Sequence, residues 1–515
     1  MIKRKPKSHH PIFDMLTVAR SMGHSVMTTS LAKSIKRRRG YRYDPREVAR
    51  YIADGSLVKF EPVLNRGLGM PAAITTAQEA RYAASVAAWL AMATSSPALP
   101  LEGQEKAPVG LTRSQERAWK LASQPGSMCL TGWPGTGKTW LAAQMIKRAK
   151  KNGAHVEVCA PTGKAASVLS LKLDGVTVRT IHRQLGLRPG GKPSRNVSAE
   201  FLFVDESSMI DEALMAHLMA MVNPEKTKVV FVGDPNQLPP VGAGAPFSRM
   251  VRHSMLTTAQ LNQVVRQEDG NGIVTLANGI VTGGRFVIPP TDVVHYYRKK
   301  SDVAAFAEEL YLKEDDGTQR NVMILTPIKQ KKFDGSTSSI NERLSYQLYP
   351  QRLIPGCKFT SGDRIMFTVN DYTHGYVNGE LGCLLDWKRK GRKAVVINDT
   401  GTEYKLEGWS IGSRAEWAYA LTIHKAQGSE CDTVILVITS DVPSMYTREL
   451  VYTAVTRAKK KLIIVGDLDI LKRAIRRRES RVTALDYFIA GGPALIQKHA
   501  AKRAESLRKV FDYGP

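Results

Sequence analysis

Residues 132–139 read Gly-Trp-Pro-Gly-Thr-Gly-Lys-Thr, and this short stretch decides the fold. It matches the pattern G-x-x-x-x-G-K-[ST], with an apolar run before it and a helical pattern, residues 140–150, after it. In a strand–loop–helix unit of this kind, backbone N–H groups close around phosphate oxygens because the glycines carry no obstructing Cβ atom. We expect Lys138 to reach the β- and γ-phosphates of a nucleotide and Thr139 to bind Mg²⁺.

A second stretch, residues 201–206, reads Phe-Leu-Phe-Val-Asp-Glu and predicts a buried strand that ends in two acids. Asp205 fits a partner of Mg²⁺, direct or through water, and Glu206 fits a base that activates a water molecule. A hydrolytic base distinguishes an ATP hydrolase from a kinase, which would instead position an acceptor hydroxyl. The two stretches together predict ATP hydrolysis, with ATP and Mg²⁺ as cofactors.

From residue 111 onward, apolar β-rich runs alternate with helical patterns. Continuous Val, Ile and Leu runs are typical of buried parallel strands joined by crossover helices. The runs form two groups, and the stretch between them, residues 357–416, carries short alternating strands and glycine turns. This texture indicates a small β-barrel insertion. The predicted class is therefore α/β, with two parallel sheets and one inserted antiparallel unit.

Residues 1–60 predict a small helical unit ahead of these sheets. Residues 44–47, Asp-Pro-Arg-Glu, match a capping box with proline at the first helical position. Residues 56–60 then predict a strand, so the order helix, helix, strand resembles a winged helix. The basic run at residues 36–39 either contacts phosphates or forms a solvated loop, and the sequence leaves both open.

Composition and charge narrow the class of protein. The 515 residues include 74 Lys and Arg against 47 Asp and Glu, a net charge of +27 that suggests a polyanionic partner such as nucleic acid. A merely soluble basic protein is the alternative. The five cysteines lie too far apart for a zinc knuckle or a CxxC site, which favours a reduced, intracellular compartment. With no signal peptide or membrane-spanning run evident, we expect a cytoplasmic protein, in a host cytoplasm if phage encoded.

Six further strings follow one another along residues 111–470 and resemble superfamily 1 DNA helicases of the 5′→3′ RecD-like and Dda-like branch. They are Leu111-Thr112-x-x-Gln115, residues 160–166 (APTGKAA), 180–183 (TIHR), 233–242 (GDPNQLPPVG), 421–430 (LTIHKAQGSE) and 451–458 (VYTAVTRA). The resemblance also fits a phage or plasmid origin. It implies an ATP-dependent DNA helicase that moves 5′→3′ along single-stranded DNA, in replication, recombination or repair.

The resemblance implies two RecA-like motor domains with parallel sheets, and an SH3-like β-barrel inserted in the second. The implied boundaries are a helical, winged-helix-like N-terminal domain at 1–94, a linker at 95–110, the first motor domain at 111–266, the second at 267–357 and 417–515, and the barrel at 358–416. Residues 187–197 fall where relatives carry a strand-separating pin. Gly190-Gly191 could turn a short hairpin there, although the segment lacks an aromatic tip.

The same resemblance assigns site residues. The catalytic set is Lys138, Glu206, Gln237, Arg266 and Arg457. Gln237 would contact the γ-phosphate and report hydrolysis to the DNA site, whereas Arg266 and Arg457 would be arginine fingers. The nucleotide-binding set is Gln115, Gly132, Gly135, Thr136, Gly137, Lys138, Thr139, Gln427, Gly428 and Glu430. The metal-binding residues would be Thr139 and Asp205.

The implied nucleic-acid contacts lie at strand ends of both motor domains. They are Thr162, Lys164, His182, Thr326, Pro327, Thr422 and His424. They should contact phosphates and sugars, because a translocating motor must not depend on the base sequence. The expected partners are single-stranded DNA and duplex junctions, with a single-strand-binding protein or other replication and recombination proteins. We expect a monomer without membrane contact.

Two alternatives remain open at this stage. One is an RNA-directed superfamily 1 helicase, although the strings at residues 160–166 and 180–183 favour DNA. The other is a DNA-binding recombination or repair subunit in which ATP hydrolysis serves as a switch. The direction of movement rests on the resemblance, supported by Pro239-Pro240 where 3′→5′ relatives place aromatic residues that stack on bases.

Overall fold

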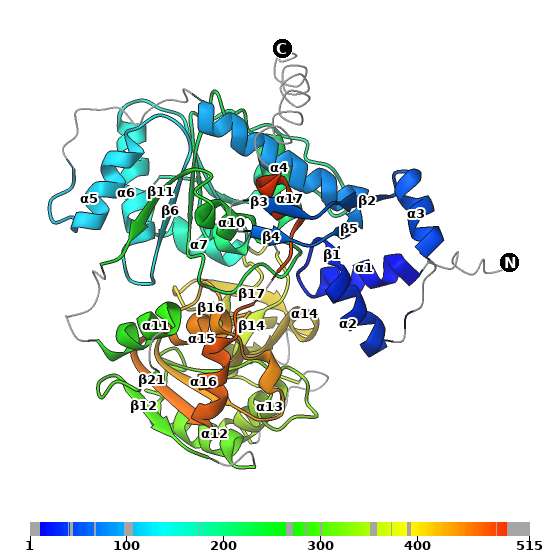
Figure 1. The fold of residues 1–515 in the computed structure, drawn as a ribbon. Coiled ribbons are helices and arrows are strands. Elements are labelled where there is room, and N and C mark those ends of the chain that lie inside the picture. The colour runs from blue at the N-terminus through cyan, green and yellow to red at the C-terminus, as the bar shows by residue number, and fades with distance from the viewer. Residues whose placement is uncertain are drawn as a thin grey trace, which may run out of the picture.

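The computed structural model describes residues 11–491, except 40, 42–44, 66–67, 97–106, 174, 264–270, 284–285, 299–300, 351–357, 372, 389–392 and 480. Two parallel sheets form an upper and a lower lobe (Figure 1). A smaller N-terminal lobe lies to the right of the upper sheet, and an inserted antiparallel sheet lies between the two lobes in this view. The predicted α/β class with two parallel sheets is confirmed.

The upper sheet has six parallel strands in the order β11-β6-β10-β9-β7-β8. Their bounds are β6 Met128–Gly132, β7 Val156–Ala160, β8 Val178–Thr180, β9 Phe201–Val204, β10 Lys228–Gly233 and β11 Thr257–Leu261. Successive side chains of a strand point to opposite faces. Phe201 and Phe203 accordingly pack in one cluster, and Leu202 and Val204 pack in another on the far side. This two-sided burial explains the continuous apolar runs of the sequence.

Helices cover both faces of the upper sheet. Helices α5 (Arg113–Ala122) and α6 (Lys138–Lys151) pack on one face. Helices α4 (Ala77–Ser95), α9 (Glu212–Ala220) and α10 (Pro246–Arg252) pack on the other. The short helices α7 (Gly163–Ser170) and α8 (Ile181–Gln184) follow β7 and β8.

The lower sheet has five parallel strands in the order β12-β21-β20-β13-β19. Their bounds are β12 Val293–Tyr296, β13 Val322–Thr326, β19 Ala420–Thr422, β20 Cys431–Ile438 and β21 Ala458–Gly466. Helices α11 (Gly272–Thr282), α15 (Arg448–Val455) and α16 (Leu468–Arg476) pack on one face. Helices α12 (Val303–Glu314) and α13 (Thr337–Leu348) pack on the other.

The insertion between β13 and β19 is a five-stranded antiparallel sheet with a core of its own. Its strands, in the order β17-β16-β15-β14-β18, are β14 Arg364–Phe367, β15 Leu381–Lys388, β16 Lys393–Asn398, β17 Glu403–Glu407 and β18 Ala415–Trp417, with helix α14 at Gly408–Arg414. Arg364 Nη2 donates to Asp399 Oδ2 at 2.7 Å, which ties the first strand to the turn after β16. The predicted antiparallel insertion is present at this place in the chain.

The N-terminal lobe is built from three helices and a three-stranded sheet of order β1-β5-β2. The elements are α1 Pro11–Ser21, β1 Met27–Thr28, α2 Thr29–Arg39, α3 Pro45–Ala53, β2 Leu57–Phe60, β3 Val63–Asn65, β4 Leu68–Met70 and β5 Ala73–Thr76. Strands β3 and β4 form a hairpin between β2 and β5. Helix, strand, helix, helix, strand, hairpin, strand is the order of a winged helix, and the buried core includes Ile12, Ile35 and Leu57.

Two chain segments lie elsewhere than the sequence predicts. Helix α4, assigned to the N-terminal domain, packs in the core of the upper sheet, and the ring nitrogen of Trp89 donates to Val222 O at 3.0 Å. Helix α17 (Ala484–Ala490), assigned to the second motor domain, packs against α4 in the same core. Burial of its apolar residues, including Leu485 and Phe488, accounts for this return of the chain.

Residues 187–197 form a turn, and no strand is assigned to them. Gly191 N donates to Arg188 O at 2.9 Å, and Ser194 N and Arg195 N both donate to Leu185 O, at 2.9 and 3.1 Å. This segment therefore folds back on the end of α8. Its role as a strand-separating pin stays a prediction.

Among the described residues, no helix combines the length and the apolarity needed to cross a bilayer.

A buried carboxyl group lies where α17 meets the upper sheet. Glu212, at the start of α9, is 1% exposed and accepts a hydrogen bond from Leu485 N at 3.1 Å. Burial raises the pKa of this carboxyl to about 8, and the neighbouring Glu79 and Asp486 act in the same direction. The hydrogen bonds from Ser25 and Leu485 oppose the shift without cancelling it.

Stability near Glu212 should therefore depend on pH. Because the pKa is raised on folding, the folded chain keeps a proton that the unfolded chain has lost, so stability falls as pH rises from about 4.5 to about 8. Glu212→Gln stays neutral and still accepts from Leu485 N. We expect its free energy of unfolding, measured in urea at pH 8, to exceed that of the parent by at least about 1.4 kcal/mol, the value of one pKa unit. At pH 5 the two proteins should be alike.

The matched control is Glu309→Gln, which changes an exposed carboxylate on α12. It should alter the free energy of unfolding neither at pH 8 nor at pH 5. An equal change at both pH values for Glu212→Gln would contradict the burial argument.

Candidate nucleotide site between the two sheets

The loop after β6 has the backbone that a phosphate-binding loop requires. Gly135 and Gly137 have φ of 77° and 80°, in the left-handed region that favours glycine. A Cβ atom on Gly132 would lie 2.6 Å from Leu261 O, so this position admits no side chain. Lys138 opens α6, and its Nζ donates to the loop carbonyls of Gly132 and Trp133 at 2.8 and 3.0 Å. The Lys138 ammonium group therefore lies beside the backbone of the phosphate-binding loop.

Hard oxygen donors stand beside this loop. Thr139 Oγ1 lies 3.5 Å from Asp205 Oδ2, and Asp205 Oδ1 accepts from Glu206 N at 2.9 Å. A hydroxyl and a carboxylate suit Mg²⁺, which usually keeps few protein ligands and binds phosphate and water as well. Among the described residues, no group of three or more His, Cys, Asp or Glu side chains forms a metal cage. The donor set thus fits a magnesium–nucleotide complex and not a structural metal.

The two acids at the end of β9 lie next to each other in the chain and are half-buried. Burial raises the pKa of both Asp205 and Glu206, and the charge of Asp205 raises that of Glu206 further. Lys138 opposes the shift of both groups, and Arg457 opposes that of Glu206. Glu206 has a φ of 50°, rare for a residue with a side chain and typical of functional sites.

Arg457 comes from the lower sheet and reaches the same pocket. It is 4% exposed, and its guanidinium donates to Thr453 O at 3.0 Å and Ser429 O at 3.1 Å. A pocket of about 730 Å³ lies between the sheets and is lined by Lys138, Glu206 and Arg457 together. Cations from both lobes thus line the same pocket as the two half-buried carboxylates.

Several hydrogen bonds join the strand end after β10 to the lower sheet. Tyr452 OH donates to Asp234 Oδ2 at 2.7 Å, and both residues are buried. Leu238 N donates to Thr453 Oγ1 at 2.8 Å, and Gln427 Nε2 donates to Leu238 O at 3.2 Å. The segment around Gln237, predicted to sense hydrolysis, is therefore held by Gln427 and by α15, the helix that ends two residues before Arg457.

Most of the predicted catalytic and nucleotide-binding residues meet here. The pocket is lined by Gly135, Gly137, Lys138, Thr139, Asp205, Glu206, Gln237, Gly428, Glu430 and Arg457. Gln237 is 7% exposed, and its backbone N donates to Asp234 O at 3.2 Å. Thr136 is buried in the loop and donates to Trp133 O at 2.7 Å. Arg266 lies outside the described residues.

Gln115, predicted to bind the nucleotide, is 2% exposed in this structure. Its Oε1 accepts from Thr112 N at 3.0 Å, in the capping box that starts α5, and its Nε2 donates to Thr136 O at 3.1 Å. Gln115 thus braces the phosphate loop here.

The predicted nucleic-acid contacts do not form one surface in this structure. Lys164 lies half-buried in the pocket with its Nζ against Ser429 Oγ, and desolvation lowers its pKa to about 8. Thr326 and Pro327 are buried, and Thr326 Oγ1 donates to Gly335 O at 2.8 Å. Lys164 lies where the two sheets and the insertion meet, whereas Thr326 is covered by the loop after β13.

The other predicted contacts are more accessible. His182 on α8 and His424 after β19 are exposed. Thr162 and Thr422 are half-buried and cap local turns: their hydroxyls accept from Ala165 N at 3.2 Å and Lys425 N at 3.4 Å. Contact of these four residues with DNA stays a prediction.

Sequence reasoning missed two walls of the site. The inserted sheet contributes Glu380, Thr400 and Tyr404 to the pocket, although they lie far along the chain from the phosphate loop. A second, smaller pocket lies between the loop residues Trp133 and Pro134 and the residues of α11. The packing of whole domains creates both walls, and no local pattern marks them.

Two family models match the chain: an AAA domain over residues 110–307 and a UvrD-like helicase C-terminal domain over 417–465. The chain is 34% identical to the ATP-dependent RecD2 DNA helicase of Deinococcus radiodurans, over 74% of this chain and 53% of the relative. It thus spans about half the length of that protein. It is 30% identical to the RecBCD enzyme subunit RecD of Mycobacterium tuberculosis, over 72% of each chain.

Among solved structures, the Pif1 helicase of Bacteroides in complex with ADP-AlF3 and ssDNA is 19% identical, with a TM-score of 0.43 over 72% of this chain and 98% of that one. This likeness is too low to carry an argument about the site. The 30% identity to RecD over 72% of both chains is sufficient to assign the family. The chain belongs to the RecD-like family of superfamily 1 helicases.

Proposed function

We propose that the protein is an ATP-dependent DNA helicase that moves 5′→3′ along single-stranded DNA and separates duplex ahead of it. One observation carries the ATPase part: a candidate base, Glu206, and a candidate arginine finger, Arg457, come from different sheets and face one pocket. The name of the Deinococcus relative, an ATP-dependent DNA helicase, supports DNA as the substrate.

The chain's own groups divide the chemistry of hydrolysis. Mg²⁺–ATP supplies the phosphoryl group, and Lys138, Thr139 and Asp205 are placed to hold it. Glu206 takes a proton from the attacking water, and the charges of Lys138 and Arg457 favour its ionised form against burial, which raises its pKa. The Arg457 guanidinium also stabilises charge that develops on the transferring group.

We place the adenine base in the smaller pocket beside the loop. Trp133 and Pro134 form one wall, and the apolar residues Ile273 and Ala277 of α11 form the other. Apolar walls on both sides suit a flat aromatic base. Because α11 packs on the lower sheet, the base as well as the phosphates would be held between the two lobes.

Binding across this cleft couples nucleotide state to domain position. The upper and lower sheets then act as the two motor domains, with the inserted sheet as a third wall. ATP draws the lobes together through Arg457, and hydrolysis weakens that attraction. Alternating grip on a strand by the two lobes moves the motor. Its partners are single-stranded DNA and duplex junctions, together with a single-strand-binding protein or other replication and recombination proteins, and it acts as a monomer in the cytoplasm.

The base assignment is tested by Glu206→Gln beside Lys138→Ala. Glu206→Gln keeps the shape of the side chain but cannot take a proton, so ATP binding should persist while turnover falls about 10²-fold or more. Lys138→Ala should lose both ATP binding and turnover, because the phosphates lose the positive charge of the lysine. Nucleotide affinity is measured by fluorescence of a labelled ATP, and turnover by phosphate release. If Glu206→Gln loses binding as severely as Lys138→Ala, Glu206 is not the base.

The link between the lobes is tested by Tyr452→Phe. This change removes the buried hydrogen bond to Asp234 and leaves a carboxylate oxygen short of a partner, at a cost of about 1–3 kcal/mol. We expect nucleotide affinity to be retained and the stimulation of ATP hydrolysis by single-stranded DNA to fall. Tyr346→Phe, an exposed tyrosine on α13, is the matched control. Unchanged stimulation in Tyr452→Phe would show that this bond carries no coupling.

Polarity and substrate are tested together with tailed duplexes in DNA and in RNA. The protein should separate the DNA duplex that has a 5′ single-stranded tail, and it should leave 3′-tailed and blunt duplexes intact. Glu206→Gln serves as the inactive control. Separation of only the 3′-tailed DNA would reverse the direction. DNA-stimulated hydrolysis without any separation would favour an ATP-switched subunit, and preferential separation of RNA would favour an RNA-directed motor.

A further inference from the structure

The N-terminal lobe presents one helix outward. None of the residues of α3 is buried, although Val48, Tyr51 and Ile52 pack half-buried on the core of the lobe. The ring of Tyr51 meets that of Phe13 edge-on, with 5.0 Å between centroids. The helix is therefore fixed by one face and leaves its opposite face accessible.

That outer face has a simple composition. Arg46, Ala49, Arg50 and Ala53 are all exposed and lie at the spacing i, i+3, i+4 and i+7, which places them on one stripe. Two short alanines let the helix backbone approach a surface closely, and two arginines supply donors and positive charge. The major groove of B-form DNA, about 12 Å wide, admits an α-helix of about 10–12 Å.

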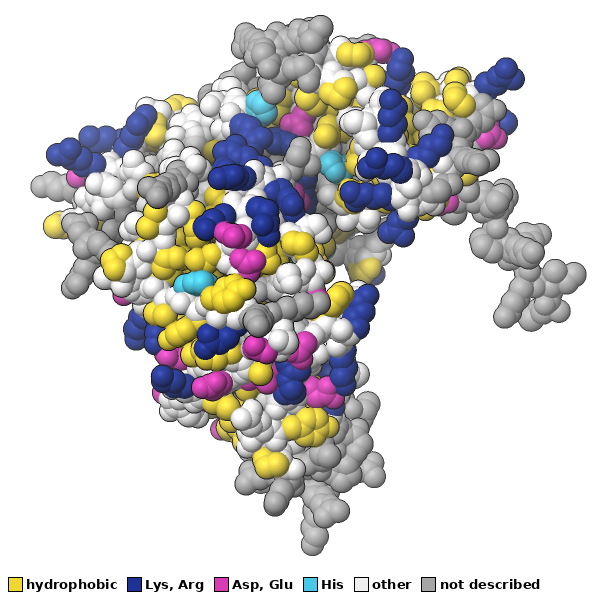
Figure 2. All heavy atoms as spheres, turned by 60° about the horizontal axis from the view of Figure 1, so that its bottom comes forward, with side chains coloured by type: hydrophobic (Ala, Val, Ile, Leu, Met, Phe, Trp, Pro, Cys, Tyr) yellow, Lys and Arg dark blue, Asp and Glu magenta, His cyan; other side chains and the backbone are white. Residues whose placement is uncertain are grey.

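The charge of the lobe suits a polyanion. Residues 1–62 contain 14 Lys and Arg against 5 Asp and Glu, a third of the chain's net charge in an eighth of its length. Helix α2, which precedes α3, ends in Lys36, Arg37, Arg38 and Arg39, all exposed. Figure 2 shows dark blue side chains spread over the lobe at the upper right, with fewer magenta ones among them.

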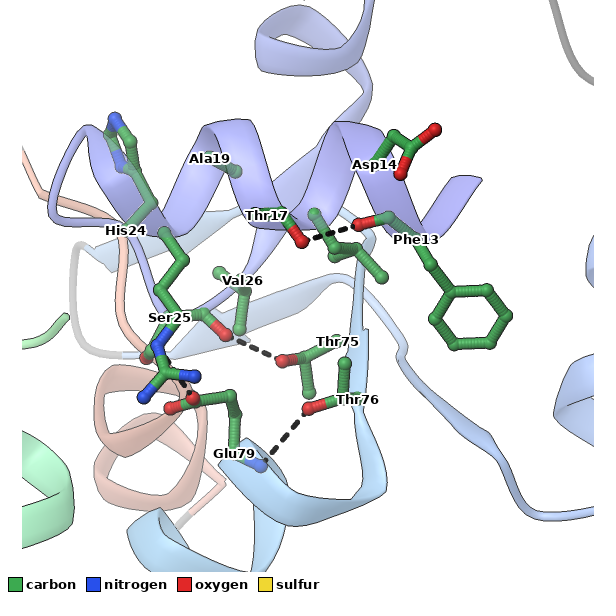
Figure 3. A pocket seen from close by; sticks show the side chains of 12 residues that line it. Phe13, Asp14, Thr17, Ala19, His24, Ser25, Val26, Thr75, Thr76 and Glu79 are labelled. Carbon is green, nitrogen blue, oxygen red and sulfur yellow. Dashed lines mark hydrogen bonds and ion pairs between the residues drawn. The ribbon is translucent and has the colours of Figure 1, made fainter. Parts of the chain in front are cut away.

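The lobe is joined to the upper sheet without a flexible connection. Strand β5 runs straight into α4, where Thr76 Oγ1 accepts from Glu79 N at 3.2 Å (Figure 3). Arg20 of α1 pairs with Glu79 at 3.2 Å. Gly244 N, in the loop after β10, donates to Gly23 O at 3.0 Å. Whatever α3 binds is therefore held in a set orientation to the motor.

We propose that this lobe is a docking site for double-stranded DNA, with α3 in the major groove and the basic end of α2 against the flanking phosphates. The site goes beyond the single-strand track of the motor and does not depend on unwinding. The stripe offers arginine but no Asn or Gln to read adenine, so binding is weakly sequence-dependent. Phosphate contacts dominate, and affinity falls with salt.

The test measures binding of the full chain to a blunt DNA duplex of about 30 base pairs, by fluorescence anisotropy at low salt. Arg46→Ala/Arg50→Ala removes the two arginines and keeps a good helix former at both positions. We expect duplex affinity to fall about tenfold or more. Affinity for a single-stranded oligonucleotide and the ATPase activity that it stimulates should stay within about twofold, since α3 lies outside the motor.

The charge-matched control is Lys147→Ala/Lys313→Ala, which removes two exposed lysines from α6 and α12, far from the lobe. It should leave duplex affinity nearly unchanged. An equal loss in both double variants, or no loss in Arg46→Ala/Arg50→Ala, overturns the proposal. A thermal melt of each variant confirms that it is folded.

Binding of the parent protein to duplex RNA tests whether α3 enters the major groove. The deep, narrow major groove of A-form RNA excludes a helix, so the parent should bind it much more weakly than DNA. Equal affinity for duplex RNA overturns docking in the major groove. Because ATP hydrolysis and unwinding are measured on the same preparations, loss of duplex binding with intact unwinding rejects only this inference. Duplex binding without unwinding rejects only the proposed function.

Discussion

Two neighbouring carboxylates, Asp205 and Glu206, lie half-buried at the end of a strand in the upper sheet, and the rest of the site is arranged around their partial loss of solvent. A buried charge is costly unless it has a partner. The upper sheet supplies Lys138, whereas the lower sheet supplies Arg457, and each opposes the rise in the pKa of Glu206. The electrostatic balance of the base therefore depends on both lobes at once. A change in their separation changes how readily Glu206 accepts a proton.

The hydrogen bonds between the lobes transmit this dependence to the chain beyond the pocket. Asp234 and Leu238 follow β10, and both bind α15, the helix that leads to Arg457. These bonds are buried, so water cannot replace them when they lengthen, and their loss carries the full cost of desolvation. Gln427 joins Leu238 from the other side. The lobes therefore move between arrangements in which these hydrogen bonds are either all formed or all broken.

Local patterns predicted the phosphate loop, the acidic strand end and the central strands of both sheets, because each is set by residues within one short stretch. The features that local patterns did not predict depend on distant packing. Thr326 is buried because the loop after β13 closes over it, and the chain from α16 returns through α17 to the upper sheet. Residues 187–197 form no strand and turn back onto Leu185 O at the end of α8. Helical and strand periodicity carries no information about such contacts.

The returning C-terminal segment brings a third part of the molecule into this coupling. Arg481 donates to Gly242 O and Gly244 O, in the loop that follows the hydrolysis-sensing segment, at 2.8 and 2.9 Å. Val482 N binds His24 Nδ1 at 3.0 Å, which fastens the same segment to the N-terminal lobe. This short stretch thus binds both the loop after β10 and the N-terminal lobe. Because it leads into α17, which packs in the core of the upper sheet, it reinforces the fixed orientation of the N-terminal lobe, so the lobe keeps its position relative to the phosphate loop.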